Sequence, residues 1–406
     1  MTNFITKRIE IVDALRGFSL AGIVIVHFIE NYIAGPPTQD FMDATHTSIF
    51  DDIIDGIIFI LIRGKFFALF SFLFGLSFFI QMDRAAGKGI NFQGRFLWRI
   101  LILLGIGYIH HLFYRGDILT IYAIVGIFLI PFYKLSTKWL LVFISVVFLG
   151  GFRYLIFSIT GGDQIFTSIE MSPDNEEIIA YYKILEEGSL WEVFKSNATQ
   201  GHLMKLDFQF GVFSRGYLTF GFFLAGLLFG RIRFFEKISE YKKLNKKILI
   251  GSIIVFILSF ILSGILFSLT NTNGTNLSFN SWINMFALSF YDLSNIAMTF
   301  ILISLFIILW KTIKGEKFLR KFIPYGKMAL SNYFVQTVIG TLILYGWGFG
   351  QIGKWPNSYI FLISILFIIL QMSFSKWWLK KFIYGPIEWF WRSLTYFKNF
   401  PLKRIK

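Results

Sequence analysis

The chain has 406 residues, of which 55% are hydrophobic and 16% charged, and its mean hydropathy is +0.63. Soluble proteins are about 45 to 50% apolar, so this composition predicts a membrane protein. The absence of cysteine excludes disulfides, cysteine-ligated metals and thiol nucleophiles. The net charge of +15 is spread over short clusters between apolar runs, which is typical of membrane-protein loops and argues against a nucleic-acid partner.

Runs of about 20 apolar residues predict helices that cross a bilayer. About ten such runs occur, near residues 13–32, 57–82, 96–114, 118–135, 139–160, 212–231, 247–270, 283–310, 328–348 and 357–379. We therefore predict an all-α polytopic helix bundle, with residues 1–406 forming a single integral-membrane domain in contact with the lipid bilayer.

The distribution of Lys and Arg predicts the orientation of the bundle, because cytoplasmic loops carry the excess of these residues. Segments 83–99, 231–247 and 311–321 are rich in Lys and Arg, whereas segment 33–52 has four Asp and no Lys or Arg. We therefore predict that both termini are cytoplasmic. Segment 231–247 is then a basic cytoplasmic linker between two halves of the bundle.

Segment 161–211 is predicted to be a long extracytoplasmic loop with structure of its own. The Ser-Pro pair at 172–173 predicts the start of one helix, and Ser189 with Glu192 predicts a capping box that starts a second. The loop either shields the bundle as a small cap or covers an outward-facing site as a lid. The sequence does not choose between these two interpretations.

Four polar residues lie in or beside the first apolar run: Asp13, Arg16, His27 and Glu30. Arg16 and His27 are eleven positions apart, so they project from nearly the same helix face, roughly 16 Å apart. Asp13 and Glu30 extend this polar stripe by one turn at each end. Charges in hydrocarbon cost at least a few kcal/mol each, so the stripe predicts a helix that lines a polar path. Alternatively, His27 hydrogen-bonds a neighbouring helix.

The third apolar run repeats this spacing, because Arg99 and His110 are also eleven positions apart, with Asp117 following. Arginine binds phosphate and carboxylate groups, and histidine moves protons near neutral pH. The pattern predicts a donor with its phosphates at the cytoplasmic side and its reacting group deeper in the membrane. Alternatively, Arg99 anchors the helix at the cytoplasmic surface.

Other polar residues inside the apolar runs are Arg153, Asp292, Asn332 and Gln336. Arg153 and Asp292 are predicted to neutralise each other, and Asn332 is a candidate substrate-binding residue. The sequence has no phosphate-binding loop of the Walker type and no HExxH pair. We therefore predict neither an ATP-driven pump nor a metal site.

Five motifs in order resemble the YeiB family of bacterial inner-membrane proteins. They are VDALRGFSLAGI at 12–23, KFFALFSFLFG at 65–75, GYIHHLFYRGDILTIYAIVG at 107–126, GKMALSNYFVQT at 326–337 and YGPIEWFWRSLTY at 384–396. This family is similar to the transmembrane acyltransferases, which include the lysosomal heparan glucosaminide N-acetyltransferase and the cell-envelope O-acyltransferases. The resemblance implies a multi-pass protein of the inner (plasma) membrane.

In the envelope acyltransferases, an Arg, ten residues and then a His on the first helix form the catalytic signature, which Arg16 and His27 match. YeiB-like chains commonly have Asn at the position of His27, which gives more weight to His110 in the motif GYIH, where that family also has histidine. His46 is the loosest match to the reactive histidine of the lysosomal enzyme.

The resemblance and the polar stripes together predict an acyltransferase. It would move an acyl group from cytoplasmic acyl-CoA, its co-substrate, to an envelope or small-molecule acceptor on the outer side, with no bound cofactor. His27 or His110 would deprotonate the acceptor or accept the acyl group. The predicted substrate-binding residues are Arg16, Arg99, Glu30, Asp117 and Asn332.

Two alternatives belong to other classes of protein. A transporter or flippase for an anionic or amphipathic small molecule would use the same arginines as its substrate site, although the sequence has no visible repeat of the kind that many transporters show. A non-catalytic membrane component would bind a lipid or a partner protein. A homodimer is compatible with the sequence, which does not define the oligomeric state.

Overall fold

The computed structural model describes residues 8–404 except 163, 168–172, 174 and 271–279. These described residues form helices and no β-strand, with one isolated bridge between Phe382 and Lys403. The first half contains α1 (Glu10–Ile29), α2 (Gln39–Thr45), α3 (Ile49–Leu61), α4 (Phe66–Ala86), α5 (Gln93–Phe113), α6 (Leu119–Ile127), α7 (Leu129–Phe132), α8 (Thr137–Phe148), α9 (Gly151–Thr160), α10 (Glu176–Glu187) and α11 (Leu190–Ala198). The second half contains α12 (Gln200–Phe210), α13 (Arg215–Arg231), α14 (Lys242–Thr270), α15 (Trp282–Trp310), α16 (Ile313–Leu319), the 3-10 turn η1 (Arg320–Phe322), α17 (Ile323–Lys327), α18 (Ala329–Leu344), α19 (Asn357–Lys381) and α20 (Pro386–Tyr396).

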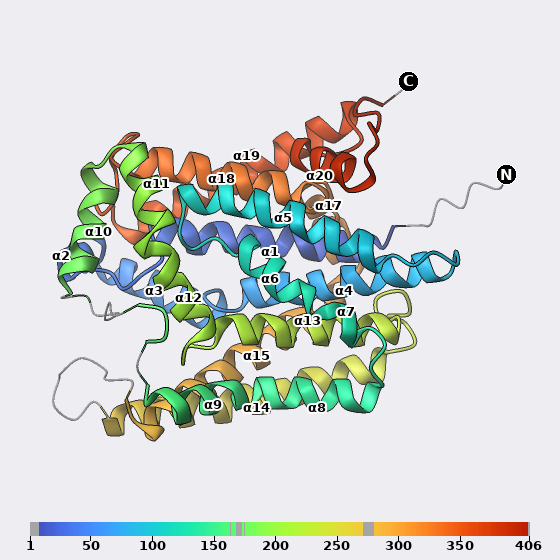
Figure 1. Cartoon of the computed structure of the whole chain (residues 1–406), viewed down its shortest axis with the longest axis horizontal. Helices are drawn as coiled ribbons and strands as arrows, with labels where there is room; N and C mark the ends of the chain where they lie inside the picture. The colour runs from blue at the N-terminus through green and yellow to red at the C-terminus, as the bar shows by residue number, and fades with distance from the viewer. Residues whose placement is uncertain (1–7, 163, 168–172, 174, 271–279, 405–406) are drawn as a thin grey trace.

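The long helices lie side by side along one axis, and both ends of the described chain lie at the same end of this bundle (Figure 1). Short helices α2, α10 and α11 gather at the opposite end. The predicted fold class, an all-α membrane helix bundle, is therefore confirmed. The compartment that each end faces stays a prediction from the Lys and Arg distribution.

Six helical stretches in the described chain are long and apolar enough to cross a membrane, and one of them consists of α3 and α4 together. The number rises to eight if each of two bent pairs, α8 with α9 and α12 with α13, counts as one span. The predicted spans 118–135 and 328–348 fall outside this set. The first is divided between α6 and α7, and the second forms the shorter apolar helix α18. The predicted number of about ten therefore stays a prediction.

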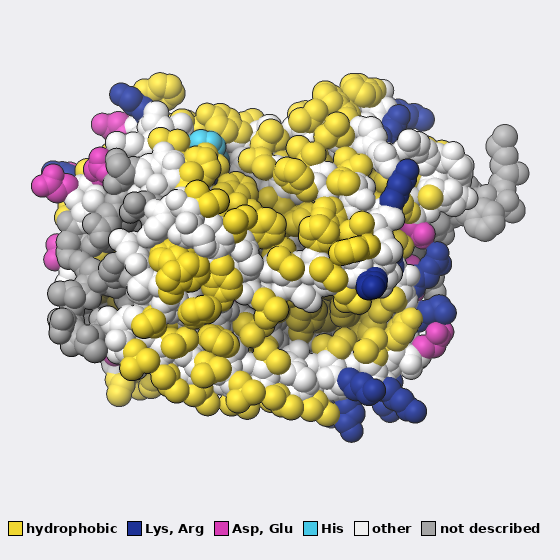
Figure 2. Space-filling model, turned by 60° about the horizontal axis from the view of Figure 1, so that its bottom comes forward, with side chains coloured by type: hydrophobic (Ala, Val, Ile, Leu, Met, Phe, Trp, Pro, Cys, Tyr) yellow, Lys and Arg dark blue, Asp and Glu magenta, His cyan; other side chains and the backbone are white. Residues whose placement is uncertain are grey.

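Burial differs sharply between the long helices. In the most apolar 18-residue stretch of α1, 72% of the residues are buried, whereas 11% are buried in the corresponding stretch of α14. The buried positions of α14 are Asn245, Ser259 and Ser263, and the Ser263 hydroxyl donates to the Ala287 carbonyl of α15 at 3.0 Å. A helix that turns large apolar side chains outward and small polar ones inward is suited to lipid contact. Figure 2 shows one face of the molecule, where apolar side chains cover most of the surface and most of the Lys and Arg gather at one end.

Helices α4 and α13 approach closely through glycine. A Cβ atom on Gly75 of α4 would lie 1.9 Å from the Phe223 carbonyl oxygen, and one on Gly226 of α13 would lie 2.0 Å from the Phe72 carbonyl oxygen. Because these positions have no side chains, the two backbones pack directly against each other. Such close van der Waals packing drives helix association in a membrane, where lipid is as apolar as the side chains and the hydrophobic effect does not hold helices together.

Two pairs of helices are sharply bent: α8 with α9 by 52°, and α12 with α13 by 55°. The breaks occur at Gly150 and Ser214, which have positive φ values of 84° and 58°. Arg153 supports the second break, because its guanidinium donates to the carbonyls of Val212 at 2.7 Å and Phe213 at 3.2 Å. Arg153 also pairs with Asp292, so the predicted neutralisation of these two buried charges is confirmed.

The predicted helices of segment 161–211 are present, with one correction. Ser189 and Glu192 form the predicted capping box at the start of α11. The preceding helix α10 begins at Glu176 with Asn175 as its N-cap, later than the Ser-Pro pair at 172–173, of which Ser172 lies outside the described residues. The segment also contains α12, which packs as the first part of the bent pair with α13.

Candidate functional site

A cavity of about 510 Å³ lies beside the last turns of α1, which are directed away from the chain termini (Figure 1). Four segments form most of its wall: the end of α1 with the chain that follows it (23–36), the turn at 62–67 between α3 and α4, the connection at 114–118 between α5 and α6, and the bend at 204–215 between α12 and α13. Tyr291 and Tyr333 complete it. We call this cavity the outer-end pocket, after the predicted orientation, in which this end of the bundle faces away from the cytoplasm. Its size is that of a typical small-molecule site.

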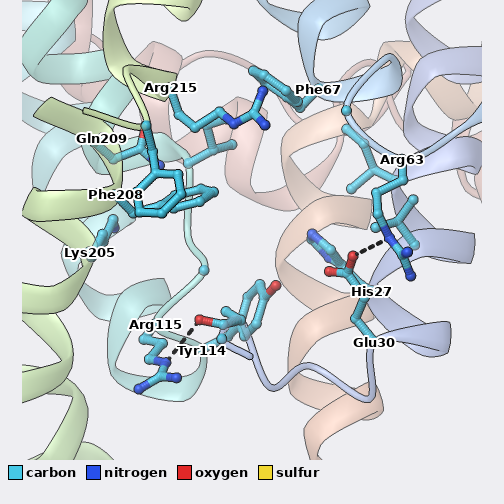
Figure 3. A pocket seen from close by; sticks show the side chains of 18 of the residues that line it. His27, Glu30, Arg63, Phe67, Tyr114, Arg115, Lys205, Phe208, Gln209 and Arg215 are labelled. Atoms are coloured by element: carbon cyan, nitrogen blue, oxygen red, sulfur yellow. Dashed lines mark hydrogen bonds and ion pairs between the residues drawn. The ribbon is translucent and has the colours of Figure 1, made fainter. Parts of the chain in front are cut away.

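Figure 3 shows how the labelled side chains divide between the two sides of the outer-end pocket. Lys205, Phe208, Gln209 and Arg215 approach from α12 and α13, and His27, Glu30 and Arg63 face them from the other side. Four basic side chains and one carboxylate line the pocket, and the basic ones are Arg63, Arg115, Lys205 and Arg215. The remaining lining is largely aliphatic and aromatic. Such a wall suits a ligand with an anionic group and an apolar body.

Arg63 joins two carboxylates at the edge of the pocket. Its Nε atom donates to Glu30 at 2.8 Å and its Nη2 atom to Asp55 at 3.0 Å. Glu30, which the sequence analysis proposed as a substrate-binding residue, therefore lines the pocket but is already paired. This ion pair also ties the end of α1 to α3.

Arg215 lies at the start of α13, next to the bend. Its Nη1 atom donates to Asp292 at 2.8 Å, and Asp292 also pairs with Arg153. Because two arginines share one carboxylate, this cluster keeps an excess positive charge. Arg215 is the member of the cluster that lines the outer-end pocket.

Arg115 follows α5 and is 3% exposed. Its Nε atom donates to the carbonyls of Ile33 at 3.2 Å and Ala34 at 3.1 Å, and its guanidinium lies 3.7 Å from the centre of the Tyr181 ring. These contacts hold the chain after α1 against the start of the α5–α6 connection. They leave the positive charge without a carboxylate partner in the described chain.

His27 lines the outer-end pocket from α1. Its ring is surrounded by tyrosines, with centroid distances of 5.0 Å to Tyr114, 5.3 Å to Tyr32 and 6.0 Å to Tyr333. Its Nδ1 atom lies 3.4 Å from the amide nitrogen of Gln336 on α18. The histidine is thus held from one side while its ring faces a pocket lined by cations.

His110 lies behind this wall and is fully buried. Its ring stacks on Tyr333 at 4.7 Å, its Nε2 atom is 2.8 Å from the Thr337 hydroxyl, and its Nδ1 atom is 2.8 Å from the Asp117 carboxylate. Nε2 therefore faces a hydroxyl group, whereas Nδ1 lies close to the Asp117 carboxylate without hydrogen-bond geometry. His27 and His110, predicted as alternatives, both lie beside the Tyr333 ring.

Asp117 organises the connection between α5 and α6. It accepts hydrogen bonds from the backbone amides of Leu119 at 3.0 Å and Thr120 at 2.9 Å, and Lys205 approaches it at 3.3 Å. Burial alone would raise the pKa of Asp117, but the charge of Lys205 and the contact with His110 outweigh it and hold that pKa well below its usual range. Asp117 is buried behind the pocket, where it secures Lys205 and the start of α6.

The other predicted substrate-binding residues lie outside the outer-end pocket. Arg16 pairs with Asp13 at 2.9 Å and donates to Ser77 of α4 at 2.9 Å. Arg99 lies 3.6 Å from the centre of the Trp391 ring of α20. Asn332 donates to Ser375 of α19 at 2.9 Å. On α1 the pocket lining begins at Ile23, two turns after Arg16, so the predicted polar path does not extend to Arg16 within this pocket.

The sequence did not predict the four basic residues of the pocket as a site. They lie at the predicted outer ends of spans, where the positive-inside bias makes basic residues uncommon: Arg63, Arg115, Lys205 and Arg215. Their position against this bias was the sequence feature that could have marked them as functional residues. It could not show that distant segments of the chain meet around one cavity.

Comparison with known proteins gives consistent matches. The family described as "Protein of unknown function (DUF418)" matches residues 229–398. The uncharacterised protein YxaH of Bacillus subtilis is 29% identical over 98% of this chain and 96% of its own length. An uncharacterised 39.9 kDa protein from the amylase 3' region of Bacillus acidopullulyticus is 27% identical over the same shares. The uncharacterised protein YeiB of Escherichia coli is 35% identical over 23% of each chain.

The chain is similar to proteins of the YeiB/DUF418 family. No solved structure matches it. Among the residues that line the outer-end pocket, all except Tyr291 and Tyr333 precede the matched segment 229–398. The relatives are described as uncharacterised, so the function has to be argued from the site itself.

Proposed function

We propose that this protein is a membrane-bound acyltransferase that moves an acyl group from cytoplasmic acyl-CoA to an acceptor held in the outer-end pocket. The observation that supports this proposal is the position of His27, a proton-accepting side chain in the wall of a pocket whose charged lining is mainly basic. We assign the role of base to His27 rather than His110, because His27 lines the outer-end pocket and His110 does not.

Gln336 would set the tautomer of His27. The Gln336 Oε1 atom is buried and has no hydrogen-bond partner in the described chain, while the amide nitrogen lies 3.4 Å from Nδ1. With the amide turned by 180°, Oε1 accepts from Nδ1–H and is satisfied. The Nε2 atom then keeps its lone pair and can accept a proton.

In the proposed reaction, the acceptor hydroxyl attacks the thioester carbonyl carbon, and Nε2 of His27 takes the hydroxyl proton. The new bond joins the acceptor oxygen to the acyl carbon, the carbon–sulfur bond breaks, and the CoA thiolate takes the proton from His27. In this proposal Arg16 and Arg99 bind the CoA phosphates, and each shares the contact that it now makes with Asp13 or Trp391. Because the outer-end pocket does not reach Arg16, a path between Arg16 and His27 has to open when acyl-CoA binds.

The proposal is tested with purified full-length protein in lipid nanodiscs, with labelled acetyl-CoA and an envelope extract as acceptor. His27→Asn should lower acyl transfer and thioester hydrolysis on the order of a hundredfold or more, as expected when a general base is removed. The same variant with full activity would remove the catalytic assignment.

His46→Asn is the matched control. His46 follows α2 and contacts Met42 at 3.1 Å and Asn357 at 3.2 Å, and it is not among the residues that line the outer-end pocket. Its substitution should leave activity unchanged. Activity lost in His46→Asn and kept in His27→Asn would move the reaction to the neighbourhood of His46.

A transporter or flippase is the second candidate, favoured by the bend between α12 and α13 at the pocket wall. Broken helices form the substrate sites of many transporters, where free backbone groups and helix ends meet the ligand. This candidate predicts substrate flux across proteoliposomes without covalent change to the substrate, and flux that persists in His27→Asn. Acyl transfer in the same preparation would count against it.

A further inference from the structure

Arg115 carries a buried positive charge with an unused donor. Its Nη2 atom is buried without a hydrogen-bond partner in the described chain, and a Cβ atom on Gly35 would lie 2.2 Å from it. Arg115 and Gly35 both line the outer-end pocket. A buried unpaired charge is strongly unfavourable, so the site is incomplete until an anion binds.

Arg215 presents a second incomplete charge from the other side of the pocket. It shares Asp292 with Arg153, so one carboxylate faces two guanidinium groups. One of its two Nη atoms donates to Asp292, which leaves further donors of this planar fork available to a ligand. The planar fork of a guanidinium group binds two acceptor oxygens of one anion, as in an arginine–phosphate pair.

The apolar part of the wall defines the rest of the ligand. Phe66, Phe67, Phe208 and Phe213 line the pocket together with Ile23 and Ile62. A free inorganic ion would make no apolar contact with these side chains. An amphiphile with a phosphate group and an acyl or other apolar body would satisfy both kinds of surface.

We propose that the outer-end pocket binds a phosphate-bearing amphiphile, with its phosphate at Arg215, a further acceptor oxygen such as that of an ester at Arg115, and its apolar body against the phenylalanines. This inference rests on the proposed function in that the amphiphile would be the acyl acceptor. The binding itself is independent of acyl transfer and is measured without acyl-CoA.

The test uses the purified full-length protein in a neutral detergent, with soluble dihexanoyl phosphatidic acid as the probe. The wild-type protein should bind this lipid on the order of tenfold or more tightly than dihexanoyl phosphatidylcholine, whose head group carries an opposing positive charge. Arg215→Gln should weaken binding by a similar factor. His27→Asn should bind normally even if it transfers no acyl group, which separates this inference from the proposed function.

Arg231→Gln is the matched control, because Arg231 lies at the other end of α13 and donates to the Tyr133 carbonyl at 2.7 Å. It should bind the lipid as the wild type does. Gly35→Ala is a second test that keeps every charge: its methyl group should displace Nη2 of Arg115 and weaken binding. This variant tests the role of Arg115 without removing its charge.

Glycerol 3-phosphate separates the two sources of the phosphate. Much weaker binding of glycerol 3-phosphate than of dihexanoyl phosphatidic acid supports the amphiphile. Equal binding identifies a free phosphate compound as the ligand and overturns the proposed apolar contacts. Equal affinity for the two lipids, or equal losses in Arg215→Gln and Arg231→Gln, would overturn the proposal.

Discussion

Asp117→Asn should destabilise the protein because it removes the carboxylate that faces buried Lys205. The asparagine oxygen can still accept from the Leu119 amide, which donates to Oδ1 at 3.0 Å. The new NH₂ group would replace Oδ2, which now accepts from the Thr120 amide at 2.9 Å and from Lys205 at 3.3 Å. The NH₂ group of the asparagine would then face the Thr120 amide and the Lys205 ammonium group, which are also hydrogen-bond donors.

The loss follows from the burial of both charges. The Asp117 side chain is 0% exposed and the Lys205 side chain 4%. Breaking a buried pair by removing one partner costs about 3 to 5 kcal/mol, because the remaining charge stays buried. Lys205→Met should cost a similar amount alone, and the double variant should cost clearly less than the sum of the two single variants.

Thermal unfolding in detergent at pH 6 and pH 8 measures both the loss and its pH dependence. The pKa of Asp117 in the folded protein lies below the ordinary value of 3.8, so its stabilising contribution is complete above that value and is lost as the pH falls through the folded pKa. The difference in midpoint between Asp117→Asn and wild type should therefore be equal at pH 6 and pH 8.

Two results would refute this reasoning. An Asp117→Asn variant as stable as the wild type would mean that the pair with Lys205 contributes nothing. Fully additive losses in the double variant would mean that the two residues act independently, and that the hydrogen bonds of Asp117 to the start of α6 account for its role.

Three further predictions follow from other contacts. Gly75→Leu should prevent the packing of α4 on α13, because even a Cβ atom would lie 1.9 Å from the Phe223 carbonyl oxygen. Fluorescence size-exclusion chromatography should then show loss of folded protein. Gly105→Leu is the control and should yield folded protein in this assay, because the space at its Cβ is open. Gln336→Met should lower the kcat of acyl transfer about ten- to hundredfold with an unchanged KM for acyl-CoA, because the tautomer of His27 is no longer held. Gln336→Glu, which offers an oxygen to Nδ1, should restore activity and shift the pH profile upward, and an unchanged profile in both variants would remove the positioning role.

The sequence predicted the helices well where a local pattern carried the information. Hydropathy located the helices that became α1, α5, α14, α15 and α19, because a helix in a membrane must satisfy its own backbone hydrogen bonds and therefore needs a long apolar run. The capping box at Ser189 was equally local, since its partner Glu192 lies three positions away.

The candidate site was predicted in part. His27 and Glu30 were singled out because charged or titratable residues are uncommon in apolar runs, and both line the outer-end pocket. Arg16 and Arg99 were grouped with them from helical spacing alone. The structure directs Arg16 to Ser77 of α4 and Arg99 to Trp391 of α20, because spacing along one helix does not specify which neighbour covers its face.

By itself the sequence determined a helical membrane protein with an unusual polar first helix, since apolar run length and the positions of charged residues are properties of short segments. Tertiary structure alone decided that Arg115, Arg215 and His27 surround one cavity and that Asp292 is shared by two arginines. These residues are far apart in the chain, and their proximity depends on which helices pack together. Close approaches such as that of Gly75 to Phe223 set that packing, and it leaves a basic, largely apolar pocket at one end of the bundle.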